Sequence, residues 1–343
     1  MTSNIKDVAK LAGTSPTTVS RVLNPGYHPV SKRTRERVEA AITQLNYKPN
    51  QLARALKSST SHLIGILVGD GSDPYFAKVI RGVSKSAQGR GYITIICNTD
   101  RDPELVYKYL KILKEYNADG IILAGGGVMD KENKERAEQI FNDLLSNGTP
   151  IMALSQQYME VPQIRIDDTL AACEMTKYLI SQGHERIGFV SGPENLLTSS
   201  MRLNGYRQAL EEAGISFIPE FVAEGNFTFE SGEKAIQYFA SLPKQPTAIF
   251  TANDQEAVGC INQLRKIDLR VPEDVSVAGF DDIEYAEHVY PSLTTVRVPM
   301  EKLGEIGAEQ LINAIETGEK IQNVMILPHE VVIRNSVKKL NWK

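Results

Sequence analysis

Residues 4–24 read NIKDVAKLAGTSPTTVSRVLN, and this stretch decides what the N-terminal part of the chain is. Its first apolar residues recur at i, i+3, i+4 and i+7, which is the spacing of one helix face: they are Ile5, Val8, Ala9 and Ala12. Asn4 is a suitable N-cap before them, and Gly13 is a suitable residue just past the helix end. Ser15 can cap a second helix that begins at Pro16. Proline is suitable at the first helical position, because the N–H that it lacks would have no hydrogen-bond partner within the helix. Two helices joined by so short a turn predict a helix-turn-helix.

The second predicted helix, Pro16–Leu23, has two different faces when its residues are placed at ~100° each. One face is apolar and can bury against the first helix; it consists of Val19, Val22 and Leu23. The other face offers hydroxyls and a guanidinium, which suit base edges and phosphates in a major groove; it consists of Thr17, Ser20 and Arg21. A third helix capped by Ser31 carries another apolar stripe, made of Val38, Ala41, Ile42 and Leu45. The three stripes together predict a small helical DNA-binding headpiece.

The distribution of charge agrees with that prediction. Residues 1–57 hold ten Lys and Arg against three Asp and Glu, a net charge of +7, whereas residues 58–343 hold 28 against 39, a net charge of −11. A cationic module on an anionic body is expected when one part of a protein meets a polyanion. A solvated basic tail would be the simpler explanation of a charge run. Apolar residues at helical spacing among these charges argue against that explanation.

A short segment after the third helix has two possible interpretations. Tyr47 and Pro49 end the third helix, and Asn50 can cap the stretch Gln51–Lys57, where Leu52, Ala53 and Leu56 share a face. A helix this short is unstable alone, since even good sequences need ~12–15 residues. The segment is therefore either a flexible tether or a helix that orders only on DNA, where Leu56 would act as an apolar wedge in the minor groove.

Length and composition limit the remaining possibilities. The 343 residues predict two or three domains at ~150 residues each. The polar N-terminus and the lack of any apolar run near ~18 residues predict neither a secretory signal nor a membrane span. Cys97, Cys173 and Cys260 lie far apart, and the five histidines show no metal-ligand spacing. We therefore expect a cytoplasmic protein without a metal or cofactor.

From Leu63 onwards, apolar runs alternate with amphipathic stretches. Strands are predicted at 63–68, 92–97, 120–124 and 151–154, with helices near 75, at 103–115 and at 131–146. The pattern recurs after Gln163, with strands ending near 167 and at 186–190, about 222, 247–251 and 275–280. Such alternation is typical of parallel sheets covered on both faces. The body is therefore predicted to be two doubly wound α/β lobes.

Polar and aromatic residues follow several of these strands, where ligands of such sheets bind. They are Asp73, Tyr75, Phe76, Arg202, Phe227, Asn253 and Asp281. Carboxylates, an amide, a guanidinium and aromatic faces suit a polyhydroxylated ligand. Four of these residues also have a simpler interpretation: Asn253 as a helix N-cap, Asp281 as a turn residue, and Tyr75 or Phe76 as core.

These residues make the chain resemble the lactose/galactose-repressor (LacI/GalR) family of bacterial transcription regulators over essentially its full length. The resemblance rests in the headpiece on IKDVA (5–9), AGTS (12–15), TVSRVLN (18–24), TRERV (34–38) and LNYKPN (45–50). In the body it rests on RLNGY (202–206), AND (252–254), GFDD (279–282) and PSLTTV (291–296). The chain departs from the family pattern at Thr14, where an apolar residue is usual, and at Pro16-Thr17, so its operator preference should differ.

The resemblance implies a particular fold and division into domains. The fold would be an all-α helix-turn-helix domain followed by a periplasmic-binding-protein-like α/β body of two doubly wound parallel sheets. The domains would be a headpiece at 1–49, a hinge helix and linker at 50–61, and an effector-binding and dimerisation domain at 62–343. Because the chain of such a body crosses between lobes three times, lobe 1 would comprise about 62–162 and 295–322, and lobe 2 about 163–291 and 326–343.

The resemblance also implies the function. The chain would be a repressor of carbohydrate-utilisation genes in the bacterial cytoplasm, associated with the nucleoid, and not an enzyme. It would bind a pseudo-palindromic operator as a homodimer or tetramer, through Thr17, Thr18, Ser20, Arg21, Asn24, Tyr47, Asn50, Ala53 and Leu56. Its effector would be a sugar or sugar phosphate, and the resemblance supports Arg202, Asn253 and Asp281 as effector contacts. Tyr75, Phe76 and Phe227 match more variable aromatic positions of the family, and Asp73 is expected to contact the effector from its place after the first strand. A purine- or protein-co-regulated repressor, or a solute-binding protein without a regulatory role, is the alternative.

Overall fold

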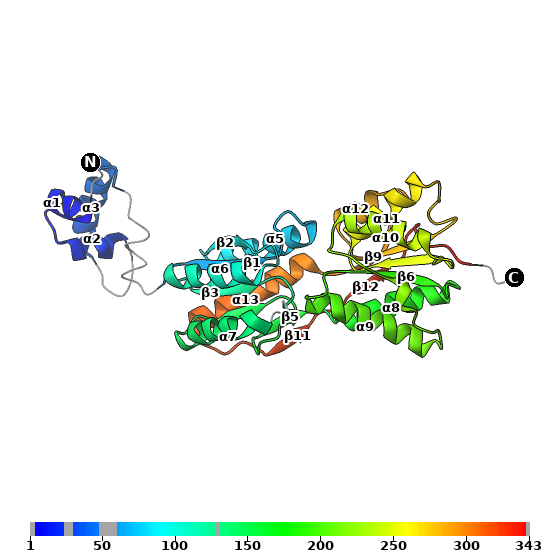
Figure 1. Ribbon diagram of the computed structural model, residues 1–343. Helices are drawn as coiled ribbons and strands as arrows, with labels where there is room; N and C mark the ends of the chain where they lie inside the picture. The colour runs from blue at the N-terminus through cyan, green and yellow to red at the C-terminus, as the bar shows by residue number, and fades with distance from the viewer. Residues whose placement is uncertain (1–3, 24–29, 48–59, 128–130, 341–343) are drawn as a thin grey trace. The chain divides into compact units, whose positions relative to one another are not determined.

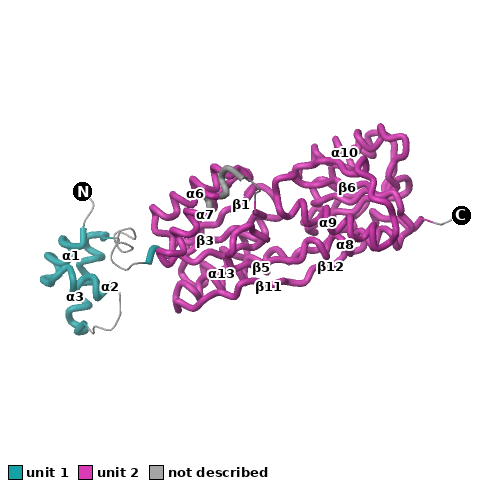
Figure 2. The backbone as a smooth tube through the Cα atoms, turned by 60° about the horizontal axis from the view of Figure 1, so that its bottom comes forward, with its two compact units in different colours: residues 1–61 teal, residues 62–343 magenta. Residues whose placement is uncertain are grey.

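The computed structural model describes residues 4–23, 30–47, 60–127 and 131–340. They belong to two compact units, Met1–Ser61 and His62–Lys343, shown in different colours in Figure 2. The predicted hinge residues Asn50, Ala53 and Leu56 lie outside the described residues, as does Asn24.

The first unit consists of three short helices around a small core. They are α1 (Ile5–Leu11), α2 (Pro16–Leu23) and α3 (Lys32–Gln44). The predicted caps are present, since the side chains of Asn4, Ser15 and Ser31 accept hydrogen bonds from backbone N–H groups in the first turns. Gly13 takes a φ of +59° between α1 and α2, a conformation that favours glycine. The three apolar stripes close on one another through Val8, Val19 and Val38, which are fully buried.

The second unit contains two sheets, each covered by helices on both faces (Figure 1). The sheet of lobe 1 is parallel and has the order β11-β5-β4-β3-β1-β2. Its strands are β1 (Leu63–Val68), β2 (Ile93–Asn98), β3 (Gly120–Leu123), β4 (Ile151–Ala153), β5 (Gln163–Arg165) and β11 (Val324–Ile326). Its helices are α5 (Pro74–Gly89), α6 (Pro103–Glu115), α7 (Lys131–Ser146) and α13 (Met300–Thr317). Alternate residues of β1 pack into the cores on opposite faces of the sheet: Ile66 packs with α5 and α13, whereas Leu67 packs with α6 and α7.

The sheet of lobe 2 has the order β12-β10-β9-β8-β6-β7 and is parallel except for β12, which runs antiparallel to β10. Its strands are β6 (Ile187–Ser191), β7 (Val222–Glu224), β8 (Ala248–Thr251), β9 (Ser276–Asp281), β10 (Thr294–Arg297) and β12 (Glu330–Val332). Its helices are α8 (Asp168–Ser181), α9 (Leu197–Glu212), α10 (Phe229–Ser241), α11 (Asp254–Lys266), the short α12 (Glu284–His288) and the 3₁₀ turn η1 (Pro219–Phe221). Helices α8 and α9 cover one face, and α10 and α11 cover the other.

The strand pairing corrects the predicted lobe boundaries. Strand β5 at 163–165 was expected to open lobe 2, but it pairs with β4 and β11 in the sheet of lobe 1. Strand β10 at 294–297 was expected to start the return to lobe 1, but it pairs with β9 in lobe 2. Strand β11 at 324–326 lies in lobe 1, beyond the predicted end at 322. An apolar run predicts a strand but not its partner, so the assignment of these short crossing segments required the structure.

Helices α5 and α13 pack with their backbones unusually close. A Cβ on Gly82 would lie 2.0 Å from the carbonyl oxygen of Glu301, and a Cβ on Gly304 would lie 2.2 Å from that of Val79. Only glycine allows this approach, because the Cβ of any other residue would lie far inside the contact distance of these carbonyl oxygens. The packing fixes α13 to α5, and Lys85 and Glu305 form an ion pair between the two helices at 2.6 Å.

We expect Gly82→Ala to lower the free energy of unfolding by about 1–3 kcal/mol or more, because the added methyl group forces the two helix backbones apart. Urea denaturation followed by circular dichroism measures the change. Gly89→Ala on the same helix is the matched control, since a Cβ there meets nothing within 4 Å. The control should be neutral or stabilising by up to about 1 kcal/mol. Equal stability of the two variants would contradict the close-packing argument.

Candidate functional site

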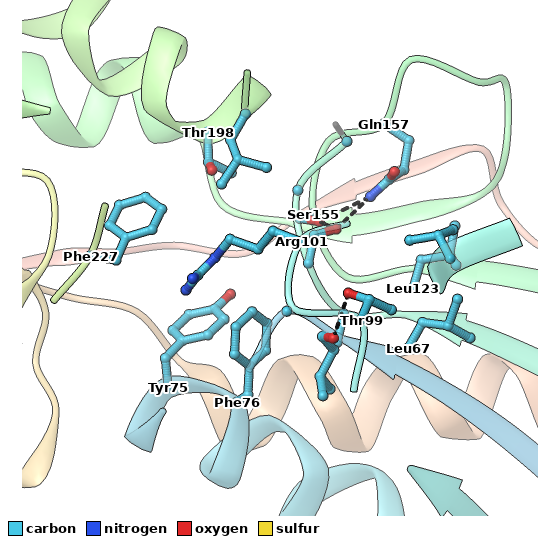
Figure 3. Close-up of a pocket in the computed structure, with 18 of the residues that line it drawn as sticks. Leu67, Tyr75, Phe76, Thr99, Arg101, Leu123, Ser155, Gln157, Thr198 and Phe227 are labelled. Carbon is cyan, nitrogen blue, oxygen red and sulfur yellow. Dashed lines mark hydrogen bonds between the residues drawn. The ribbon is translucent and has the colours of Figure 1, made fainter. Parts of the chain in front are cut away.

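A cavity of about 510 Å³ lies where the carboxyl ends of the strands of both lobes face each other (Figure 3). Lobe 1 contributes residues that follow β1, β2, β3 and β4, and lobe 2 contributes residues that follow β6, β7 and β8 or end β9. The structure brings all seven residues predicted for the effector to this one cavity: Asp73, Tyr75, Phe76, Arg202, Phe227, Asn253 and Asp281. Their role as ligand contacts stays a prediction. The lining also includes residues that were not predicted, among them Thr99, Arg101, Ser155, Gln157 and Thr198.

A buried guanidinium organises the lobe 2 side of the cavity. Arg202, on α9, donates from Nε to Asp168 Oδ1 at 2.9 Å, and its Nη2 lies 3.5 Å from Asp281 Oδ1. Its Nη1 donates to the carbonyl of Ala252, and its planar group lies over the Phe280 ring at 3.7 Å from the centroid. Asp168 was not predicted, because only the fold places the first residue of α8 beside α9.

Asp281 presents a carboxylate to the cavity in an unfavourable setting. Its φ is +111°, outside the usual range of L-residues, and burial raises its pKa well above the ordinary value. Its Oδ1 is buried without a hydrogen-bond partner among the described residues. A strained and incompletely satisfied polar group at a cavity is typical of a binding site, where a ligand can complete its hydrogen bonds.

Phe227 is held over the cavity by hydrogen bonds on both sides of its backbone. Its N–H donates to Glu256 Oε1 at 2.9 Å, and its carbonyl accepts from Asn253 Nδ2 at 3.1 Å. These bonds support a φ of +68°, which is rare for an aromatic residue. Asn253 also caps α11, since its Oδ1 accepts from the N–H of Glu256 at 2.9 Å. The simpler interpretation of Asn253 as an N-cap is therefore correct, and the residue lines the cavity as well.

Arg101 reaches across the cavity from lobe 1. Its guanidinium lies 5.4 Å from the centre of the Phe227 ring and 4.0 Å from Asp73 Oδ2. Asp73 caps α5 by accepting from the N–H of Tyr75 at 2.9 Å. Arg101 was not predicted as a cavity residue; it follows β2 in a turn where Asp100 has a φ of +49° and Arg101 one of +59°. Nothing in the residue pattern of that turn indicates that its side chain points to the other lobe.

The first unit carries its own candidate surface on α2. Thr17 and Arg21 are exposed, Thr18 and Ser20 are half-buried, and Val19 and Val22 point into the core. The predicted outward face of this helix is thus present. Tyr47, predicted to contact DNA, is half-buried and packs against the core of the unit.

No group of His, Cys, Asp or Glu side chains in the described ranges could hold a metal ion. All three cysteines are buried and free. Among the helices that the structure describes, none is long and apolar enough to cross a membrane.

The geometry around Glu256 predicts a pH dependence of stability. Burial raises its pKa from 4.5 to about 8, so the folded protein keeps a proton that the unfolded chain releases between those pH values. This contribution to stability is complete below pH 4.5 and is lost as the pH rises through 8, at about 1.4 kcal/mol per pH unit. Glu256→Gln keeps the shape and removes the titration. The free energy of unfolding of the variant, measured relative to that of wild type, should therefore rise by about 2 kcal/mol when the pH is raised from 5.5 to 7.5.

Urea denaturation of both proteins at the two pH values measures this gain. Glu230→Gln, an exposed position at the start of α10, is the matched control and should follow wild type at both. A stability difference between Glu256→Gln and wild type that does not change with pH would contradict the raised pKa of Glu256.

Comparisons with known proteins agree with this arrangement. Residues 4–50 match the family model "Bacterial regulatory proteins, lacI family", and residues 176–337 match "Periplasmic binding protein-like domain". The ribose operon repressor of Escherichia coli (strain K12) is 36% identical over 313 residues, which are 91% of this chain and 93% of that protein.

Two solved structures are also similar. The lac repressor dimer bound to operator and the anti-inducer ONPF superposes with a TM-score of 0.87 at 27% identity, covering 98% of this chain and 100% of that one. A LacI family transcriptional regulator from Enterococcus faecium with bound ribose superposes with a TM-score of 0.72 at 27% identity, covering 81% of this chain and 100% of that one.

The comparisons confirm the predicted fold class, a helix-turn-helix domain followed by a two-lobed α/β body. Proteins of this kind are DNA-binding transcriptional regulators, so these similarities also confirm the prediction that the chain is a regulator and not an enzyme. From the extent of these similarities, the chain belongs to the lacI family of bacterial regulatory proteins.

Proposed function

We propose that this protein represses carbohydrate-utilisation genes and responds to a sugar-containing effector bound in the cavity between its lobes. The observation that carries the proposal is the convergence of Arg202, Asn253 and Asp281 with three aromatic side chains on one cavity. The relatives support the class of ligand, since one is named a ribose operon repressor and another was solved with bound ribose.

The polar end of the cavity fits a hydroxylated ring. Asp281 Oδ1 is in an ion pair with Arg202 but accepts no hydrogen bond within the described residues, so it can accept one from a ligand hydroxyl. The guanidinium of Arg202 beside it can donate to a neighbouring ligand oxygen. The rings of Tyr75, Phe76 and Phe227 offer apolar faces for the C–H side of a sugar. The same rings could stack on a purine, which remains the second candidate effector.

The charges of the lining favour a neutral sugar over a sugar phosphate. Among the described residues that line the cavity, the charged ones are Asp73, Arg101, Arg202 and Asp281, two of each sign. Arg202 is already paired with two carboxylates, and Arg101 lies beside Asp73. A phosphate would have to displace these carboxylates or lie next to them, which is electrostatically costly.

For the first unit we propose operator binding through α2. Thr17, Ser20 and Arg21 would enter a major groove, with phosphate contacts from the surrounding basic residues. Thr18, Asn24, Tyr47, Asn50, Ala53 and Leu56 complete the proposed contact set. The protein would act in the bacterial cytoplasm, at the nucleoid, as a homodimer on a pseudo-palindromic site or as a tetramer of two such dimers.

Effector binding would control operator affinity through the relative position of the lobes. Arg101 and Phe227 already touch across the cavity, so a ligand between them changes a contact that joins lobe 1 to lobe 2. A coupling of about 1–3 kcal/mol between the two sites would be typical of such regulation. In the proposed mechanism the segment at 50–61 transmits the change to the headpiece.

Asp281→Asn should weaken effector binding by about 100-fold, because an amide cannot replace a carboxylate that accepts charge-assisted or multiple hydrogen bonds. A thermal-shift screen of pentoses, hexoses, sugar phosphates and nucleobases identifies the ligand, and isothermal titration calorimetry measures both proteins. Asp268→Asn, in a turn of lobe 2 away from the cavity lining, is the matched control and should bind as wild type. Full affinity in Asp281→Asn would contradict the proposed site.

Arg21→Ala should weaken binding to an inverted-repeat operator by about 1–3 kcal/mol if Arg21 contacts a base, and should lower the salt slope by ~1 if it contacts phosphate. Fluorescence anisotropy at several salt concentrations, with a scrambled duplex alongside, separates the two cases. Lys108→Ala, an exposed position on α6, removes the same charge from the body and should change neither quantity. Wild-type binding by Arg21→Ala at every salt concentration would exclude the proposed face of α2.

A further inference from the structure

The ring of Phe227 occupies a position that its own backbone does not favour. Phe227 has a φ of +68°, in the left-handed region, where a bulky L-residue is strained unless the surrounding structure holds it. The ring lines the lobe 2 side of the cavity, and the guanidinium of Arg101 from lobe 1 lies 5.4 Å from its centre (Figure 3). Whatever holds this backbone therefore also sets one wall of the cavity and one contact between the lobes.

The group that holds it is a carboxyl outside the cavity. Glu256, on α11, is fully buried and is not one of the described residues that line the cavity. Its Oε1 accepts from the N–H of Phe227 at 2.9 Å and from Ser231 Oγ at 3.0 Å, and the same Oγ accepts from the N–H of Thr228 at 3.3 Å. One carboxyl oxygen thus anchors, directly or through Ser231, two successive peptide N–H groups of the turn that carries the ring.

Glycines leave the space that this arrangement needs. A Cβ on Gly225 would lie 2.1 Å from Glu256 Oε1, and a Cβ on Gly232 would lie 2.1 Å from the backbone carbonyl oxygen of Glu256. A Cβ on Gly192 would lie 2.1 Å from the ring of Phe227. A side chain at any of these three positions would overlap the carboxyl, the backbone of α11 or the ring, so the packing leaves room for both groups only where they now lie.

The carboxyl acts here as a neutral hydrogen-bond acceptor. Burial raises the pKa of Glu256 to about 8, so most of these side chains are protonated at neutral pH. Oε1 is the acceptor, and Oε2 has no hydrogen-bond partner among the described residues. A glutamine has the same shape and the same acceptor oxygen, whereas a methionine has a similar length and only a weak acceptor.

From these contacts we infer that Glu256 is a positioning residue for effector binding: it does not touch the effector, but it holds Phe227 where the ring closes the lobe 2 side of the cavity. The inference rests on the proposed function and adds a residue to the machinery of that same site. Loss of the acceptor lowers the population of the binding-competent turn, and the apparent affinity for the effector falls by the same factor.

Hydrogen exchange followed by mass spectrometry tests the first step without any ligand. In wild type at neutral pH, the amides of Phe227 and Thr228 should exchange slowly, because both donate to buried groups. Glu256→Met should speed their exchange by about tenfold or more, whereas Glu256→Gln should stay within about twofold of wild type. Unchanged exchange in Glu256→Met would mean that the carboxyl does not hold the turn, and the inference would be wrong.

Calorimetric titration tests the effect on the cavity, with ribose, glucose, galactose and adenosine as probes. For the probe that wild type binds most tightly, Glu256→Met should weaken binding by about tenfold, the factor expected for one lost buried hydrogen bond, and Glu256→Gln should restore it to within about twofold. Ser231→Ala removes one donor to Oε1 and keeps the carboxyl. It is the milder variant if Glu256→Met does not fold, and it should weaken binding by about threefold.

The matched control lies on the same helix. Gln263 is a buried polar residue about two turns further along α11, and it is not one of the described residues that line the cavity. Gln263→Met makes the same kind of change as Glu256→Met without touching the turn at Phe227. It should bind the probe as wild type does.

A double-mutant cycle separates this role from a general loss of stability. If Glu256 acts through Phe227, Glu256→Met should change the affinity of Phe227→Ala by less than about twofold, since no ring remains to be positioned. An equal loss in both backgrounds, or full affinity of Glu256→Met, would overturn the inference while the proposed function stands. If wild type binds none of the four probes, the proposed function fails, and the role of Glu256 in binding fails with it.

Discussion

The body of this protein depends on one buried charge, the guanidinium of Arg202. A buried cation costs several kcal/mol of lost hydration unless its partners are well placed, and here the partners come from separate elements: Asp168 from α8, Asp281 from the end of β9, and the carbonyl of Ala252 after β8. Any movement of these elements that breaks the cluster would expose an unpaired charge to a dry interior. The lobe 2 wall of the cavity is therefore held in one arrangement before a ligand arrives.

The opposite wall is fixed by different means. Asp73, Tyr75 and Phe76 stand at the first turn of α5, and α5 is packed backbone to backbone against α13 through Gly82 and Gly304. Lobe 1 thus holds its cavity residues through close steric fit, whereas lobe 2 holds them through charge and hydrogen bonds. Between the two walls, the contact of Arg101 with Phe227 joins two residues whose backbones both lie in the left-handed region. Such strain is stored only where the surrounding structure maintains it.

Sequence reasoning predicted those parts of the fold that depend on local pattern. The helices 103–115 and 131–146 have their predicted bounds, because their apolar period is a local property. Helix α9 begins at Leu197 without a side-chain cap, so no local signal marks its start. Strands β5 and β10 were assigned to the wrong lobes, because pairing is a long-range property. The seven cavity residues were predicted from their positions after strand ends. Asp168 and Arg101 were not predicted, because their roles depend on which residues the folded chain brings near them.

The path of the chain has a consequence for how the protein is made. Within the described residues it passes between the sheets three times, after β5, after β10 and after β11, so each sheet contains pieces from distant parts of the sequence. On the ribosome, where domains generally fold as units from the N-terminus, lobe 1 cannot complete its sheet until residues 324–326 have emerged, and lobe 2 must wait for residues 330–332. A premature stop anywhere before residue 324 would therefore leave the sheets of both lobes incomplete, and no single proteolytic cut could release either lobe intact.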